Sequence, residues 1–161
     1  NKKYEQLVEH SREGNGKAKV CNLELLSEMG EPLLIVEGNA IGIIKISIIF
    51  YEDCQCAVGY HIRDEKNEQI LGSNTVYEGI GEISGNAGDR IIIEFKTELP
   101  LKEGRYNIMT VLSTSVFINR TVEFVDIAKD GIYFDVLEKK PYRIWNMVQL
   151  PNSVKVTKIA N

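Results

Sequence analysis

Polar side chains recur at every second position of two apolar segments, residues 43–51 and 56–64, and could share one surface. They are Ser47 and Tyr51 in the first segment and His61 and Arg63 in the second. Successive residues of a strand point to opposite faces, so these side chains lie opposite the apolar ones. If both strands belong to one sheet, the four side chains line one exposed face, where a guanidinium could bind two hydroxyls or a phosphate.

Motifs that indicate catalysis are absent from the sequence. It contains no Gly-x-Ser-x-Gly, no His-Glu-x-x-His, no phosphate-binding loop ending in Gly-Lys-Ser/Thr and no dinucleotide fingerprint. The glycine-rich run at 79–85 is not followed by the helix that a nucleotide loop requires. A structural zinc site would need a fourth ligand beside the three cysteines, and the chain has only His10 and His61 to supply it. We therefore expect no enzyme, no metal and no cofactor.

Apolar residues repeat with a period of two from residue 19 onward, which is typical of strands with one buried face. The clearest strands cover 21–25, 44–50 and 91–95, and others are expected at 55–63, 69–73, 104–113, 116–125, 131–137 and 144–156. Turn residues separate them, including Lys129-Asp130-Gly131. Nine or ten short strands without a long helix predict an all-β fold, an antiparallel sandwich of immunoglobulin-like or jelly-roll type.

Composition limits the domain organisation and the partners. The chain has 161 residues, enough for one domain with a substantial core, and a net charge of −4 with scattered basic residues, so nucleic acid is not an expected partner. The longest apolar stretch is too short to cross a bilayer, and the start of the chain does not lead into a signal peptide, which favours a cytoplasmic location. Residues 1–18 are polar, so we expect a linker or arm with at most one helical turn before a domain at 19–161.

Residues 59–75 form the most specific stretch of the sequence. A strand ending in Gly59-Tyr60-His61-Ile62-Arg63-Asp64 is followed by a turn and a return strand ending in Gly72-Ser73-Asn74-Thr75. Further on come Gly88-Asp89 before a strand, Leu99-Pro100-Leu101-Lys102-Glu103-Gly104-Arg105-Tyr106, and Met147-Val148-Gln149-Leu150-Pro151. In this order and spacing, residues 17–156 resemble the carboxy-terminal carbohydrate-binding domain of Wzt-type ATPases. These are the nucleotide-binding subunits of ABC transporters that export O-antigen polysaccharide in Gram-negative bacteria.

The resemblance implies recognition without catalysis or cofactor. Such a domain would bind the terminally modified non-reducing end of the O-polysaccharide and so license its export, in the cytoplasm at the inner membrane. The implied partners are the ATPase and membrane subunits of the transporter, with the ATPase domain before residue 1 and residues 1–18 ending the interdomain linker. Similar proteins are homodimers whose final strand crosses to the partner's sheet, and we expect Ile144–Val156 to be the exchanged segment.

A carbohydrate site needs aromatic ring surface and planar polar groups. The candidates for carbohydrate binding are Ser47, Tyr51, His61, Arg63, Asn74, Thr75, Tyr77 and Trp145. Most of them have an alternative structural role. His61 could be a solvated strand histidine, Arg63 could pair with a neighbouring carboxylate, and Asn74 could form an Asx-type turn. Tyr77 could simply pack, and we favour a dimer seam over a sugar platform for Trp145.

Two other functions remain open from the sequence. One is a sandwich that mediates only protein contacts through its edge strands, in which case substitution of His61 and Arg63 would leave partner binding unchanged. The other is a small glycan-modifying enzyme, which detectable turnover of a glycan would reveal.

Overall fold

The computed structural model describes residues 2–37, 39–117 and 120–159. A short helical segment precedes a series of strands in this part of the chain. The elements, in chain order, are α1 (Lys2–Val8), the 3-10 helix η1 (Glu9–Ser11), β1 (Arg12–Glu13), β2 (Ala18–Leu26), β3 (Ile35–Val36), β4 (Ile41–Phe50), β5 (Cys54–Arg63), β6 (Gln69–Asn74), β7 (Ile83–Gly85), β8 (Arg90–Glu98), β9 (Gly104–Phe117) and β10 (Thr121–Val136).

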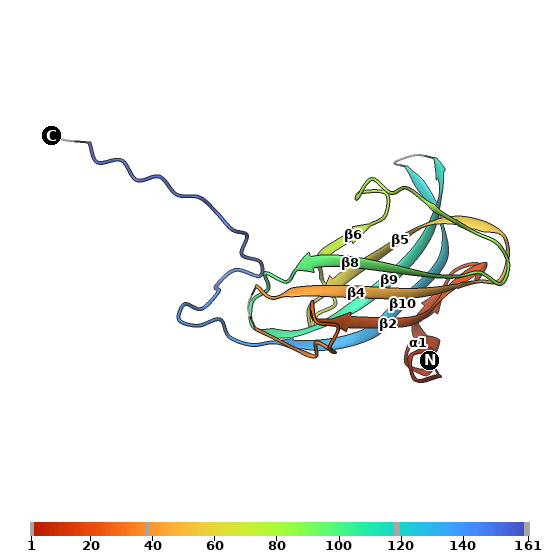
Figure 1. Cartoon of the computed structure of the whole chain (residues 1–161), viewed down its shortest axis with the longest axis horizontal. Coiled ribbons are helices and arrows are strands. Elements are labelled where there is room, and N and C mark those ends of the chain that lie inside the picture. Colours follow the sequence, from red (N-terminus) through yellow and green to blue (C-terminus); the bar gives the residue numbers. More distant parts are fainter. Residues whose placement is uncertain (1, 38, 118–119, 160–161) are drawn as a thin grey trace.

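The strands form two packed sheets (Figure 1). The larger sheet has the order β1-β10-β9-β5-β6, with β3 parallel to β10 and β7 antiparallel to β5. The smaller sheet has the order β2-β4-β8, and all its pairs are antiparallel. The predicted all-β, largely antiparallel sandwich is therefore confirmed.

The core lies between the two sheets and follows the predicted alternation. Every second side chain of β4, from Ile44 to Phe50, is fully buried. On the facing sheet, Val58 and Ile62 of β5 are also fully buried. The rings of Tyr60 and Phe95, one from each sheet, meet edge to face with centroids 5.1 Å apart. Parity along β4 and β5 thus identifies the inner faces correctly.

Strand β10 is longer than the sequence suggests. A strand at 116–125, a turn at Lys129-Asp130-Gly131 and a second strand at 131–137 were expected. Instead, β9 ends at Phe117 and β10 begins at Thr121, so the range 116–125 is divided between two strands of a hairpin. Residues 118–119 lie outside the described part of the chain. The expected turn is an irregularity within β10, where the register against β9 shifts between Ala128 and Ile132. Glycine fits there because a Cβ at Gly131 would lie 2.9 Å from the carbonyl oxygen of Ile108.

The amino-terminal segment is folded against the sandwich. Helix α1 places Tyr4 and Val8 in the core, and β1 pairs with β10. The amides of Asn15 and Gly16 donate to the carbonyls of Phe124 and Val125 at 3.0 and 2.9 Å. This corrects the expectation of a polar arm, because two apolar side chains on one helical face suffice to dock the helix. A preceding ATPase domain stays a prediction.

The carboxy-terminal segment contains no strand among the described residues after Val136, although one was expected at 144–156. Ile144 is buried, and Val148 forms an isolated antiparallel bridge with Leu101. Residues 151–159 are exposed and lead away from the sandwich (Figure 1). Exchange of this segment with a second chain stays a prediction. No helix in the described residues is long and apolar enough to cross a membrane.

Candidate binding groove

The predicted surface shared by Ser47, Tyr51, His61 and Arg63 is wrong. The first two belong to β4 and its end, in the smaller sheet, whereas the other two belong to β5, in the larger sheet. Outward side chains of facing sheets point in opposite directions. The reason lies in the connection between the strands: the amides of Tyr51 and Glu52 donate to the carbonyl of Lys17 at 2.7 and 3.0 Å. The chain is thereby turned across to the other sheet instead of closing a hairpin.

Tyr51 and Ser47 consequently lie away from β5. Tyr51 is about half exposed, and the ammonium of Lys19 lies 5.8 Å from the centroid of its ring. Ser47 faces outward on the smaller sheet, where its carbonyl accepts from the thiol of Cys21 at 3.4 Å. Neither residue meets the other sequence-predicted candidates.

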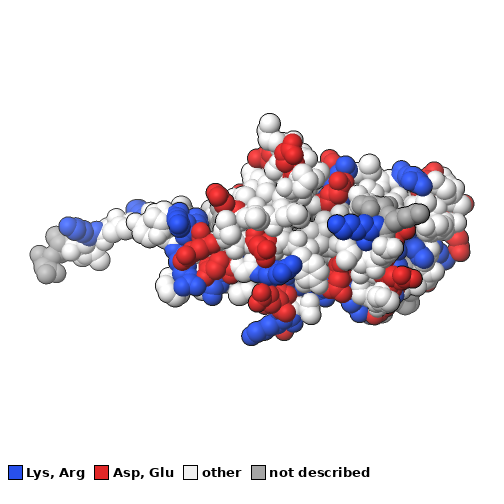
Figure 2. Space-filling view, turned by 90° about the horizontal axis from the view of Figure 1, so that it is seen from below, with Lys and Arg blue, Asp and Glu red and all other residues white. Residues whose placement is uncertain are grey.

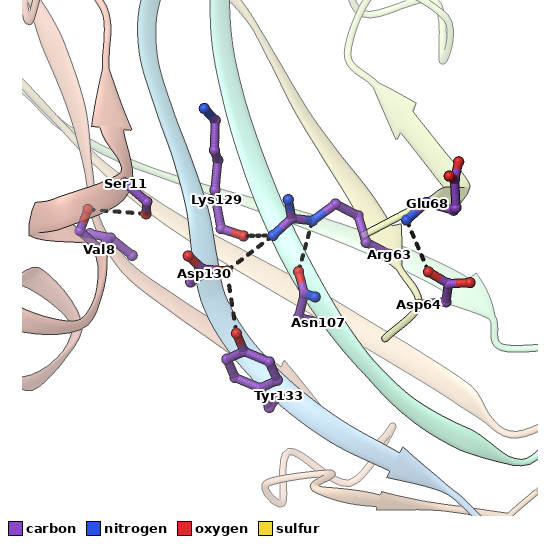
Figure 3. Close-up of polar contacts among 9 residues, drawn as sticks. All are labelled: Val8, Ser11, Arg63, Asp64, Glu68, Asn107, Lys129, Asp130 and Tyr133. Carbon is purple, nitrogen blue, oxygen red and sulfur yellow. Dashed lines mark hydrogen bonds and ion pairs between the residues drawn. The ribbon is translucent and has the colours of Figure 1, made fainter. Parts of the chain in front are cut away.

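Arg63 is occupied by a network within the larger sheet (Figure 3). It is 7% exposed, and its Nε donates to Oδ1 of Asn107 at 2.9 Å. Its Nη2 donates to the carbonyl of Lys129 and lies 3.1 Å from Oδ1 of Asp130, to which the hydroxyl of Tyr133 also donates at 3.3 Å. The partner carboxylate is thus on β10, across β9, and not beside Arg63 in the sequence. All three bonds direct the guanidinium along the sheet.

Asn74 and Thr75 largely serve the turn after β6. Oδ1 of Asn74 accepts from the amides of Val76 and Tyr77, each at 2.9 Å, which is the Asx-type turn considered as the alternative. Thr75 is 2% exposed, and its Oγ1 accepts from the amide of Val58 at 3.2 Å. Thr75 is therefore a buried structural residue, whereas Asn74 also lines a hollow.

That hollow lies on the outer face of the larger sheet and has a volume of about 380 Å³. It is lined by Ala57, Gly59, His61, Gln69, Ile70, Leu71, Gly72, Ser73, Asn74, Tyr77, Val111 and Ser113. Gly59 of β5 and Gly72 of β6 are part of its lining and add no side chain to it. A Cβ at Gly72 would lie 2.6 Å from the carbonyl oxygen of Tyr60 and 2.8 Å from Nδ1 of His61, so this position requires glycine.

His61 enters the hollow with an uncharged ring at neutral pH. Burial, and secondarily the positive charge of Arg63, lower the pKa of His61 from its ordinary value of 6.5. A neutral imidazole can donate from one ring nitrogen and accept at the other. The ring can therefore bind a hydroxyl group either as a hydrogen-bond donor or as an acceptor.

A second hollow of about 840 Å³ adjoins the first one. The two share Ala57, Asn74, Tyr77 and Ser113, and the second is bordered by residues 76–82 and by the β9–β10 hairpin. Tyr77 stands between them and is 81% exposed. We call the two hollows together the binding groove.

The groove contains residues that the sequence reasoning missed. Gln69 and Ser113 line the first hollow, and Val76, Val116 and Val122 line the second. Two glycines within predicted strands were the available signal, since a strand glycine often marks a close backbone approach. Trp145 lies outside the groove, 77% exposed, with the guanidinium of Arg143 5.3 Å from the centroid of its ring.

The two sheets define a β-sandwich domain with a groove on the outer face of the larger sheet. A family model described as the Wzt C-terminal domain matches residues 9–150, and the chain therefore belongs to the Wzt C-terminal domain family. This confirms the resemblance seen in the sequence. Membership is consistent with a carbohydrate-binding role in O-antigen export. Among the curated proteins, no sequence matches this chain significantly.

One solved structure agrees with this fold. The crystal structure of the C-terminal domain of Wzt superposes with a TM-score of 0.78 at 23% sequence identity, covering 91% of this chain and 87% of that one. The CARDB domain of a Pyrococcus furiosus protein, in complex with di-metal ions, has a TM-score of 0.39 at 13% identity, covering 71% of this chain and 90% of that one. The second similarity is too low to carry an argument.

Proposed function

We propose that the binding groove holds the terminally modified non-reducing end of an O-antigen polysaccharide and that this binding selects the polymer for export. The domain has a recognition role and no catalytic one in this proposal. Family membership motivates it, and the observation that carries it is an exposed tyrosine ring beside a hollow with planar polar groups.

The chemistry of the groove suits a sugar ring. The face of Tyr77 can stack on the apolar C–H face of a pyranose, while the amides of Gln69 and Asn74 and the ring of His61 can bind neighbouring hydroxyls. A different hollow of about 650 Å³ lies between β6 and β8, but its lining includes three glutamates and its aromatic residues, Tyr60 and Phe95, belong to the core. The binding groove is therefore the better candidate.

Selection follows from differences in affinity. A terminal group that fits the groove displaces water and pairs with the polar side chains, whereas a chain end without it leaves buried polar groups unpaired. Each unpaired group costs about 1–3 kcal/mol, or about 5-fold to 150-fold in affinity. One or two such groups are enough to discriminate between complete and incomplete polymers.

The test is a calorimetric titration with O-polysaccharide from the strain that encodes the chain, in forms with and without the terminal modification. We expect binding of the modified form only. Tyr77→Ala should weaken it by about tenfold or more, since stacking area is lost. Tyr51→Ala is the matched control, because Tyr51 is also an exposed tyrosine but lies at the other sheet. Equal binding of both polysaccharide forms would refute the proposal.

We further propose that the domain is a homodimer in which Ile144–Val156 crosses to the partner. The support is that residues 151–159 are exposed in the single chain and carry the apolar side chains Val154, Val156 and Ile159. Sedimentation analysis should give a dimer for the whole chain and a monomer for a variant ending at Arg143, which lacks the exchanged segment. A monomeric whole chain would refute the exchange.

The proposed setting is the cytoplasmic side of the inner membrane, with the ATPase and membrane subunits of an ABC transporter. Figure 2 shows acidic and basic side chains interspersed on one face of the molecule, which does not resemble a surface for nucleic acid. Copurification with the transporter subunits from membranes would support this setting. Absence of the domain from the membrane-bound transporter would refute it.

A further inference from the structure

We propose that the chain end accepted by the binding groove is an uncharged sugar with a small apolar substituent, such as a methyl ether or a deoxy methyl group, and not an anionic one. This inference rests on the proposed function and specifies its ligand. It follows from the charges and the apolar side chains of the two hollows.

The first hollow has no fixed charge among its described lining residues. Its only titratable side chains are His61 and Tyr77, and the lowered pKa of His61 leaves that ring neutral at pH 7. A phosphate or carboxylate entering such a hollow would lose hydration without gaining an ionic partner. Arg63, two residues after His61 on β5, does not line the hollow and is held by Asn107 and Asp130.

The second hollow has an apolar wall. Val76, Val116 and Val122 line it, and each is roughly half exposed in the free chain. Clustered exposed apolar side chains are uncommon on soluble domains and mark binding surfaces. Because Tyr77 and Ala57 line both hollows, a sugar stacked on Tyr77 would direct its substituents toward these valines. A methyl group buried there gains affinity, whereas a charged group does not.

Among its described lining residues, the second hollow also has two charged side chains, and their charges are opposite. Glu82 accepts from the amide of Ser115 at 2.7 Å, which fixes its carboxylate at the wall. Arg120 is exposed at the hairpin. An anionic ligand would have to bind Arg120 against the repulsion of Glu82, so Arg120 is the residue that separates the two possibilities experimentally.

The probes are three oligosaccharides built on the repeat of the strain's own O-polysaccharide. They differ only at one position of the terminal residue, which carries a free hydroxyl, a methyl ether or a phosphate monoester. We expect the methyl ether to bind about fourfold more tightly than the free hydroxyl, the gain of one buried methyl group. We expect the phosphate to bind at least tenfold more weakly than the methyl ether.

Variants of residues in the second hollow show where the terminal substituent binds. Val76→Ala and Val122→Ala should each remove most of the preference for the methyl ether, measured in each variant as the ratio of its affinity to that of the free hydroxyl form. Ile92→Ala is the matched control, because Ile92 is an exposed apolar side chain on β8, outside the binding groove. Arg120→Gln tests the anionic alternative, because a preference for the phosphate form that depends on Arg120 would be lost in this variant.

The outcomes separate the two proposals. If the phosphate form binds most tightly and Arg120→Gln abolishes that preference, the present inference is overturned while glycan binding stands. If the methyl ether is preferred but the valine variants do not alter the preference, the valine wall is the wrong location and the inference is also overturned. If neither the three probes nor the intact polysaccharide binds, the proposed function itself fails.

Discussion

Replacement of Arg63 by methionine distinguishes a structural arginine from a ligand-binding one. Methionine retains most of the apolar stem, so the main loss is the three polar contacts of the guanidinium. Asn107 is 3% exposed and would keep an unpaired Oδ1, and the Lys129 carbonyl would also lose its donor. At about 1–3 kcal/mol each, these two groups predict a loss of about 3 kcal/mol in the free energy of unfolding.

Asp130 contributes less to this sum. Its side chain is 42% exposed and can be hydrated when the guanidinium is absent, so its ion pair adds about 0–1 kcal/mol. Asp130→Asn should therefore cost less than about 1 kcal/mol. Arg105→Met is the matched control, because the Arg105 side chain is 60% exposed and lies 4.0 Å from Asp135 on the same sheet. We expect it to change stability by less than about 0.5 kcal/mol.

The assay is urea unfolding followed by fluorescence, combined with polysaccharide titration of the folded variants. Arg63→Met should lower the unfolding midpoint and leave the affinity of the folded fraction within about twofold of the original chain. The reasoning would be refuted by an Arg63→Met variant that unfolds at the original midpoint but no longer binds the polysaccharide. That result would make the guanidinium a ligand contact.

Two further predictions concern His61 and helix α1. The pKa of His61, followed by NMR and assigned with His61→Gln, should lie below 6.5. Folded His61 then binds its proton at a lower pH than unfolded His61 does. The neutral ring therefore contributes to the free energy of unfolding above pH 6.5, and this contribution falls as the pH drops toward the folded pKa. A pKa at or above 6.5 would contradict the burial argument. Val8→Ala should cost about 2 kcal/mol because Val8 is fully buried, whereas Leu7→Ala, at an exposed position of the same helix, should cost less than about 0.5 kcal/mol in thermal or urea unfolding. Equal costs would mean that α1 does not dock.

The sequence predicts the faces of the strands well because side-chain parity is a local property. The buried residues of β4 and β5 could be assigned without any structure, since an alternating pattern has one apolar side wherever the strand lies. The same pattern does not indicate which sheet a strand joins. That choice depends on contacts distant in sequence, such as the bonds from the amides of Tyr51 and Glu52 to the carbonyl of Lys17.

The candidate site was harder to predict for the same reason. His61, Asn74 and Tyr77 were named from the sequence and all line the binding groove, but Ser47 and Tyr51 were assigned to it through the wrong sheet. Arg63 was named as well, although its partners Asn107 and Asp130 come from β9 and β10, which only the tertiary fold brings to β5. A buried arginine and a ligand-binding one have the same sequence signature.

The binding groove depends on two glycines as much as on the side chains that line it. Gly59 and Gly72 lie on adjacent strands, and a Cβ at Gly59 would lie 3.0 Å from Cβ of Asn74. At both positions the neighbouring strand approaches so closely that a larger residue would have to displace backbone or ring atoms. The exposed ring of Tyr77 lines the same hollow as these two glycines, together with His61, Gln69 and Asn74. The close strand contacts that require glycine thus leave room beside the ring, where a sugar could meet several polar groups together.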